Sequence, residues 1–357
     1  MREEDWARAD TLIRRKFGAV PFSDQVLFAV VRSDTAAERR LREQALEMAG
    51  KKGRRTKGWA VEAGWFLATY QEDLGRAEEF ARFGAASSIP PGLQATAHEL
   101  LAGLGVAGGR WSAAELEFAA AAAAHPDSAL IGRALAASLP FLAVPKPALE
   151  AIRGEVDRWT PGSDVSSPLP ESIRPLTGHL RLYLLGLLSV RLGAVADALR
   201  YAGEIQRLPA PPESGALVRD LERTIRADVA GATGRTAAAL ALLDGVKGEV
   251  PFELIRLPYF SEEHARYLRA LFLQRSGRDA EALRLAEVAF IGTPNEMHYR
   301  APVHFLRAEI QQRLKNRPAA AEEYARFMAL WRACDPALRP VVEGAKAELA
   351  AMAAEPR

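Results

Sequence analysis

The feature that most constrains the fold is a recurrence of small residues and helix breakers in the stretch that ends at Leu349. These residues occur where two packed helices, and the turn that joins them, need close approach or a break in the chain. The first unit carries them at Ala270, Gly277, Ala282, Ala286, Ala289 and Pro294, and the second unit repeats the spacing at Ala308, Ala320, Tyr324 and Phe327. The pattern predicts two consecutive helical hairpins and a closing helix, an arrangement that offers a surface for binding.

The same register extends toward the amino terminus. Turn residues and prolines mark further units over residues 22–50, 59–90, 102–126, 130–161, 182–212 and 227–251. We therefore expect an all-α fold, a right-handed α-solenoid of about eight helical hairpins. A helix over residues 336–354, with one apolar stripe, is expected to cap its carboxyl end.

Composition supports this fold class. Hydrophobic residues make up 49% of the 357 residues, and many are alanine, which has the highest helix propensity. The 47 basic and 45 acidic residues nearly balance, so we expect no nucleic acid as partner. The longest apolar windows, Leu130–Val144 and Leu180–Val190, are too short to span a bilayer. With no signal-peptide pattern at the amino terminus, the sequence predicts a cytoplasmic chain without a membrane partner.

Two segments interrupt the regular array. Residues 161–178, rich in Pro, Ser and Gly, predict a connector between an amino-terminal half (1–160) and a carboxy-terminal half (179–357). Residues 1–16 predict an amphipathic helix whose hairpin partner is missing. The unpaired helix indicates a truncated chain or a gene split from a longer one, and it also offers a surface for self-association.

Motifs that suggest chemistry have simpler explanations. Gly103-Leu-Gly105-Val-Ala-Gly108 matches a dinucleotide-binding pattern, but that site needs a preceding strand and a helical segment precedes it here, so we interpret it as a turn between helices. The basic run 51–57 lacks interleaved aromatic residues and is interpreted as a solvated connector, with phosphate or an acidic partner as the alternative.

No catalytic, cofactor or metal site is predicted. The histidines at 98, 125, 179, 264, 298 and 304 show no metal-ligand spacing, and Cys334 has no base nearby in sequence. A serine elbow and a Walker loop are also absent from the sequence.

The best candidate site is the concave face that stacked hairpins form with the first helix of each pair. Helical counting places these residues there: Glu62, Phe66, Thr69, Glu99, Tyr183, Leu187, Asp228, Tyr267, Leu271, Gln274, Phe305, Glu309 and Gln312. Aromatic rings beside carboxylates and amides suit an extended protein or peptide segment, and they favour one with basic side chains. The alternative is that Tyr183, Tyr267 and Phe305 only pack between repeats.

The carboxy-terminal third carries a family resemblance. It rests on these segments: Pro258-Tyr-Phe-Ser-Glu262, Arg266-Tyr-Leu-Arg-Ala270, Gly277-Arg-Asp-Ala-Glu281, Ala301-Pro-Val-His304, Arg307-Ala-Glu309 and Leu330-Trp-Arg-Ala-Cys-Asp-Pro336. They resemble the tetratricopeptide-repeat (TPR) region that follows the catalytic domain in some bacterial serine/threonine protein kinases, and DNA-binding domains in some bacterial regulators. The close match covers roughly the last hundred residues, and the rest is similar only in periodicity.

The resemblance implies a TPR fold and a scaffolding or sensory role in bacterial signalling, without enzymatic activity, because the kinase motifs are absent. TPR domains that hold a terminal carboxylate use Lys and Asn at lining positions, which this chain does not. The alternative function is the regulatory carboxy-terminal part of a longer kinase or DNA-binding regulator whose effector domain lies upstream.

Overall fold

The structure, a computed structural model, describes residues 8, 11–16, 18–20, 22–49, 58–86, 89–161, 171–248, 261–288 and 294–354. Over these residues the fold is all-α, as the sequence predicts, and none of them forms a strand. The basic run 51–57 lies outside the described residues, as does most of the expected first helix, of which residues 11–16 are helical. None of the described helices is long and apolar enough to cross a membrane.

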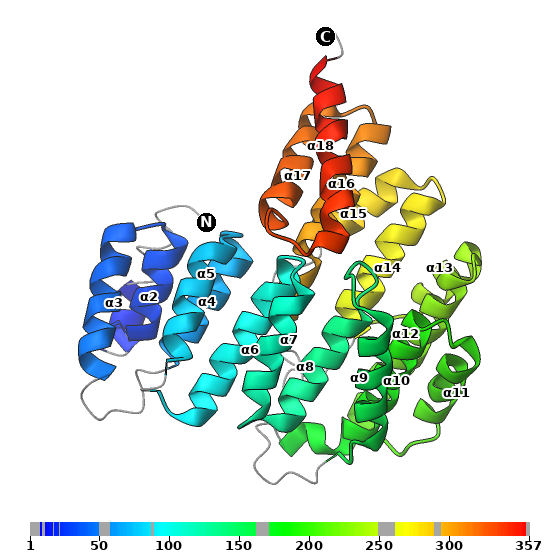
Figure 1. Ribbon diagram of the computed structural model, residues 1–357, viewed down its shortest axis with the longest axis horizontal. Helices are drawn as coiled ribbons and strands as arrows, with labels where there is room; N and C mark the ends of the chain where they lie inside the picture. Colours follow the sequence, from blue (N-terminus) through cyan, green and yellow to red (C-terminus); the bar gives the residue numbers. More distant parts are fainter. Residues whose placement is uncertain are drawn as a thin grey trace.

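The helices follow one another in contacting pairs (Figure 1). The pairs are α2 (Phe22–Val31) with α3 (Thr35–Ala49), α4 (Trp59–Tyr70) with α5 (Leu74–Gly84), α6 (Pro91–Ala107) with α7 (Trp111–Ala122), α8 (Pro126–Ser138) with α9 (Lys146–Arg158), α10 (Thr177–Arg191) with α11 (Val195–Ile205), α12 (Gly215–Ala232) with α13 (Thr236–Leu243), α14 (Ser261–Arg275) with α15 (Asp279–Val288), and α16 (Arg300–Arg313) with α17 (Arg317–Leu330). A last helix, α18 (Arg339–Ala354), packs on α17.

Short 3-10 helices join some pairs: η2 (Glu171–Leu176), η3 (Pro212–Ser214), η5 (Pro294–Tyr299) and η6 (Pro336–Leu338). The first helix of a pair also contacts the first helix of the next pair, as α4 does α6 and α12 does α14. The first helices therefore form one continuous layer.

Most turns inside the pairs share one conformation. A residue with positive φ ends the first helix, at Gly109, Gly193, Gly234 and Gly277, and also at Ser33, Glu72 and Lys315. In the glycine turns the next residue donates its N–H to a carbonyl five positions earlier, as Arg110 does to Gly105 over 2.8 Å. This bond satisfies a carbonyl that the helix end leaves open, and glycine adopts positive φ without steric cost.

The glycine motif at residues 103–108 is placed differently from our expectation. Gly103 and Gly105 lie inside α6, and only Gly108 belongs to the turn. A Cβ at Gly105 would lie 3.2 Å from the backbone nitrogen of Ala114 on α7. The missing side chain therefore allows α6 and α7 to approach closely, so the motif serves helix packing, and a helix precedes it where a dinucleotide site needs a strand.

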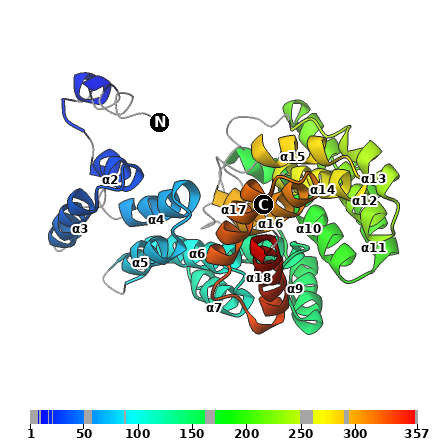
Figure 2. The ribbon, with the colours of Figure 1, turned by 90° about the horizontal axis from the view of Figure 1, so that it is seen from above.

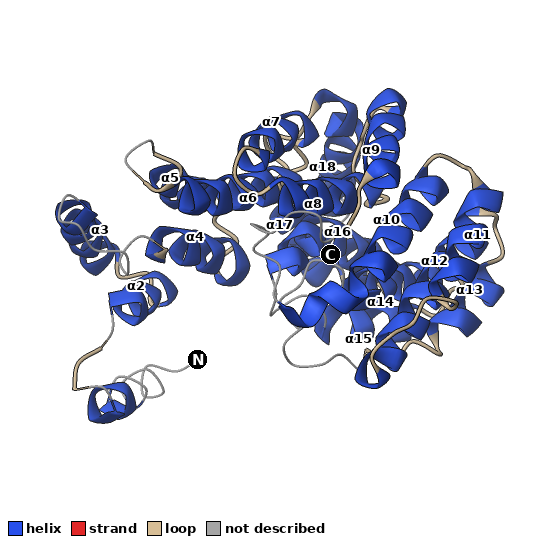
Figure 3. Cartoon of the chain, turned by 90° about the horizontal axis from the view of Figure 1, so that it is seen from below, coloured by secondary structure: helices blue, strands red, loops and turns tan. Residues whose placement is uncertain are grey.

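The chain curls so that its carboxy-terminal helices return to the middle of the amino-terminal half (Figure 2). Helices α16–α18 lie near α6 and α7 in this view, and the view from below agrees (Figure 3). The contact is specific: the Asp335 N–H donates to the Gly109 carbonyl (3.0 Å), and Trp331 Nε1 donates to the Ala107 carbonyl (3.1 Å). We call the contact between residues 69–112 and residues 300–335 the closure interface.

Asp335 also completes a distant helix. Its Oδ2 accepts the backbone N–H of Ser112 (3.1 Å) and its Oδ1 accepts the Ser112 hydroxyl (2.7 Å), at the first turn of α7. Arg110, the residue that precedes α7, makes no side-chain cap there. A carboxylate at a helix amino terminus pairs with open N–H groups and with the helix dipole. The closure interface therefore supplies the cap that α7 lacks locally.

The buried core runs past the predicted connector. One cluster of buried residues extends from Ala102 to Ala345, and a smaller one joins α2–α6 with Met297 of η5. Residues 162–170 of the connector lie outside the described part of the chain, while η2 leads directly into α10, which packs on α8 and α9. The described residues on the two sides of the connector thus share one core.

Candidate functional site

A cavity of about 370 Å³ lies between α4, α6, α8 and η5, and Phe118 of α7 also lines it. Apolar side chains supply most of its wall: Val61, Trp65, Leu100, Phe118, Leu135 and Met297. Its polar lining residues are Glu62, Thr96, Glu99, Ser128 and His298. Because Glu62 is exposed and also lines the cavity, the cavity reaches solvent at α4. Its size and its apolar wall with a few polar groups are typical of ligand sites.

Two side chains set the electrostatics of this cavity. Burial raises the pKa of Glu99, against the effect of a hydrogen bond from Ser128 and of nearby His125. Its Oε1 is buried, and its contact with His125 Nδ1 is long, at 3.5 Å. Burial lowers the pKa of His298 to about 4, so this imidazole is neutral at neutral pH. No Lys or Arg is among the described lining residues, so carboxylates supply the formal charge.

The predicted concave-face residues of α4 and α6 partly meet at this cavity. Glu62 and Glu99 both line it. Phe66 is half-buried, with its ring 4.9 Å from that of Trp65. Thr69 is fully buried, and its carbonyl accepts a hydrogen bond from Arg300 at the closure interface. Three of these four residues therefore lie at or beside a surface that a ligand can reach.

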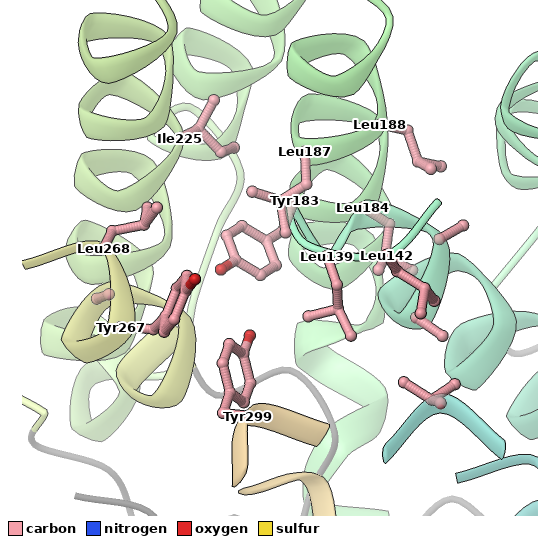
Figure 4. Packing of buried hydrophobic residues seen from close by; sticks show 14 of the residues in the cluster. Leu139, Leu142, Tyr183, Leu184, Leu187, Leu188, Ile225, Tyr267, Leu268 and Tyr299 are labelled. Atoms are coloured by element: carbon pink, nitrogen blue, oxygen red, sulfur yellow. The ribbon is translucent and has the colours of Figure 1, made fainter. Parts of the chain in front are cut away.

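The corresponding residues of α10 and α14 lie in the core. Tyr183 and Leu187 are each 1% exposed and Tyr267 is 7% exposed. Tyr183, Tyr267 and Tyr299 of η5 point toward one another (Figure 4), and the Tyr267 and Tyr299 rings are 5.5 Å apart. Phe141 packs edge-on against both of those rings. The ring contacts match the alternative in which these aromatics pack between parts of the chain.

Asp228 is also buried, and it takes part in a polar series. His264 Nδ1 lies 3.2 Å from the Tyr299 hydroxyl, and its Nε2 lies 3.5 Å from Asp228 Oδ2. All three residues are less than a tenth exposed. A hydroxyl, an imidazole and a carboxylate in series can relay a proton in an open site, but here they are packed in the core. The series therefore satisfies buried polar groups, which are costly when unpaired.

The remaining predicted residues make contacts between helices. Gln274 Nε2 donates to Glu309 Oε2 (2.7 Å), which joins α14 to α16. Gln312 donates to Glu348 of α18 and accepts from the Tyr324 hydroxyl. Phe305 packs on Tyr324 and Phe327 of its own hairpin, and Leu271 packs partly buried against the core. These five residues do not meet at the cavity.

A polar cluster holds the closure interface. Glu72 pairs with Arg300 (2.9 Å) and His304 Nε2 (3.0 Å), and His304 Nδ1 pairs with Glu323 (2.5 Å). Burial alone would lower the pKa of His304, but the hydrogen bonds to Glu323 and Glu72 outweigh it and raise the pKa. Burial likewise opposes the effect of His304 and Arg300, which together lower the pKa of Glu72. The cluster therefore favours a charged imidazolium between two carboxylates.

Sequence reasoning did not propose Trp65, Met297 and His298 as site residues, although all three line the cavity. Trp65 is one helical turn from Glu62, so helical counting could have included it. Met297 and His298 lie nearly two hundred residues from Glu99 in sequence, and they reach the cavity only because the chain returns on itself.

Comparisons with known proteins add no family assignment. No protein-family model, no curated protein and no solved structure matches this chain.

Proposed function

We propose that this chain is a non-catalytic binding module, a right-handed α-solenoid of TPR-like hairpins that holds a protein or peptide along its concave face. A scaffolding or sensory role in bacterial signalling is the setting that the resemblance suggests. The observation that carries the proposal is the cavity between α4, α6, α8 and η5, because it is preformed, largely apolar and open at Glu62. A preformed pocket loses less ordering entropy on binding than a mobile surface does.

The accessible part of the predicted face lies in the amino-terminal half. Trp65 and Phe66 offer half-buried rings beside the Glu62 carboxylate. Partly exposed aromatic residues around a pocket are typical anchors of peptide interfaces. In this proposal α4 and α6 provide the anchor, while the buried tyrosines of α10 and α14 maintain the curvature that places η5 against it.

Selection of peptides from a random displayed library tests the proposal. The full chain would be the bait, and the Glu62→Ala, Phe66→Ala double variant would serve for counter-selection. We expect selected peptides to bind wild type at least about tenfold more tightly than the variant, which is the effect of losing about 1.4 kcal/mol of interface energy. Leu116→Ala on α7, where the side chain is 73% exposed, is the matched surface control and should bind as wild type does. Equal affinity for all three proteins would reject this face as the binding site.

A further inference from the structure

We infer that the cavity between α4, α6, α8 and η5 is a specificity pocket for one cationic side chain, a lysine or arginine, of the bound partner. The inference rests on the proposed function and adds the chemistry of the residue that anchors the partner. It follows from the shape of the pocket, from the charges on its wall and from a buried carboxylate oxygen of Glu99 that makes only a long contact with its neighbour His125.

The pocket suits a long side chain with an apolar stem. Its volume is about 370 Å³, and Val61, Leu100 and Met297 line it together with the rings of Trp65 and Phe118. Lysine and arginine bury their methylene groups against such surfaces while the charged end seeks polar partners. The Trp65 ring adds an aromatic face, which attracts an ammonium or guanidinium group.

The charges on the wall are complementary to a cation. Glu62 and Glu99 bring two carboxylates, and the described lining residues include no lysine or arginine. His298 contributes no positive charge at neutral pH, because burial holds its pKa at about 4. An anionic ligand would be repelled here, and a neutral apolar side chain would cover the partly buried Glu99 carboxylate without adding a hydrogen-bond donor to it.

Polar atoms in the wall of the pocket could also accept hydrogen bonds from a ligand. Glu99 Oε1 is buried and makes only a long contact, 3.5 Å, with His125 Nδ1, and His298 Nε2 is buried with no partner among the described residues. Buried polar atoms are almost always hydrogen-bonded in folded proteins. An ammonium carries three donors and a guanidinium five, so either group can satisfy the Glu99 oxygen and leave donors for other acceptors.

The test compares four pentapeptides that differ only in the central residue, which is lysine, arginine, norleucine or glutamine. Two glycines lie on each side of that residue, and both ends of each peptide are blocked. Each would be titrated into the full chain while the indole N–H resonance of Trp65, assigned with Trp65→Phe, is followed by NMR. We expect the lysine or arginine peptide to bind about tenfold or more tightly than the norleucine peptide, as a charged hydrogen bond warrants. Glu99→Gln should remove this preference, whereas Glu150→Gln, an exposed carboxylate on α9, should keep it.

Two outcomes would overturn the inference in distinguishable ways. If the norleucine peptide binds as tightly as the lysine and arginine peptides, the pocket is an apolar anchor and the proposed function stands without its cationic specificity. If none of the four peptides shifts the Trp65 resonance, the pocket is not an anchor at all. The proposed function is then decided by the library-selected peptides, whose binding is measured without reference to any one side chain.

Discussion

The first helices of the two halves present aromatic and acidic residues at equivalent positions, yet the structure uses these positions differently. On α4 and α6, Glu62, Trp65 and Glu99 border a cavity that reaches solvent. On α10 and α14, Tyr183 and Tyr267 are buried, and the Tyr267 ring packs against those of Tyr299 and Phe141. The comparison shows that helical register decides which way a side chain points, whereas distant parts of the chain decide whether a ligand can reach it.

The short helix η5 produces both environments. Tyr299 at its end packs among the tyrosines, while the preceding Met297 and His298 form a wall of the cavity. The helix continues directly into α16, whose Arg300 and His304 hold the closure interface through Glu72. The helix η5 thus packs on the inner surface of the carboxy-terminal half and also forms part of the accessible cavity of the amino-terminal half.

The strongest way to break the comparison is to truncate a buried tyrosine. Tyr183→Ala removes a large side chain that is 1% exposed, so we expect the free energy of unfolding to fall by about 3–5 kcal/mol. Urea denaturation measures the change, with Leu116→Ala as the exposed control that should stay within about 0.5 kcal/mol of wild type. A Tyr183→Ala protein as stable as the control, but unable to bind the selected peptides, would place the functional surface in the carboxy-terminal half after all.

Closure of the chain should depend on pH through His304. Its raised pKa means that this stabilisation is complete below the ordinary value of 6.5 and is lost as pH rises through the raised value. The lowered pKa of Glu72 gives the opposite limit, because its contribution is complete above 4.5 and is lost as pH falls through the lowered value. Closure is therefore strongest between about pH 4.5 and 6.5, the ordinary pKa values of the two groups, where both contributions are complete.

Replacement of His304 measures this dependence. His304→Gln should lower the free energy of unfolding by about 1.5–3 kcal/mol at about pH 6, the usual contribution of hydrogen bonds to a charged group. The difference from wild type should shrink as pH rises through the raised pKa, because the imidazole then becomes neutral in the folded chain as it already is in the unfolded one. Parallel stability curves for the two proteins across this range would show that the charge of His304 does not hold the closure interface.

Glycine-to-alanine substitutions compare packing in the two halves. A methyl group at Gly231 on α12 would overlap the ring of Phe272, and such overpacking costs about 1–3 kcal/mol. A methyl group at Gly103 on α6 would meet the flexible end of Met297 beside the cavity, where the side chain has room to move. Because alanine stabilises a helix by about 0.5–1 kcal/mol over glycine, Gly103→Ala should be close to neutral. Thermal unfolding of both variants measures the contrast, and equal destabilisation would mean that the cavity wall is as rigid as the core.

The sequence predicted the local features of this fold and missed the long-range ones. The sequence predicts a turn at each of four glycines, because glycine at regular spacing is a strong helix-ending signal. These are Gly109, Gly193, Gly234 and Gly277. The same conformation at Lys315 carries no such signal, because lysine has no preference for positive φ. The all-α class follows from the local patterns alone.

The site shows the same division. Glu62 and Glu99 were predicted because helical counting places them on one face of adjacent first helices. His298 and Met297 were not predicted, because they reach the cavity through the accumulated curvature of all the pairs between α8 and α16. Curvature depends on small rotations at each interface, which no residue pattern encodes directly. For the same reason, the sequence supports the burial of Tyr183 and Tyr267 only as an alternative to their exposure on the concave face.

The substitution with the smallest expected effect on stability, Glu99→Gln, is the most direct test of which half is functional. Burial raises the pKa of Glu99, so its ionised form costs stability above that pKa, and the cost disappears when the side chain cannot ionise. Glu99→Gln should therefore leave the free energy of unfolding at neutral pH unchanged or raise it by up to about 1 kcal/mol, while weakening ligand binding. Tyr183→Ala should show the reverse, because a packing residue loses stability when it is truncated. A Glu99→Gln protein that unfolds more easily than wild type would mean that this carboxylate supports the fold and was not retained for a ligand.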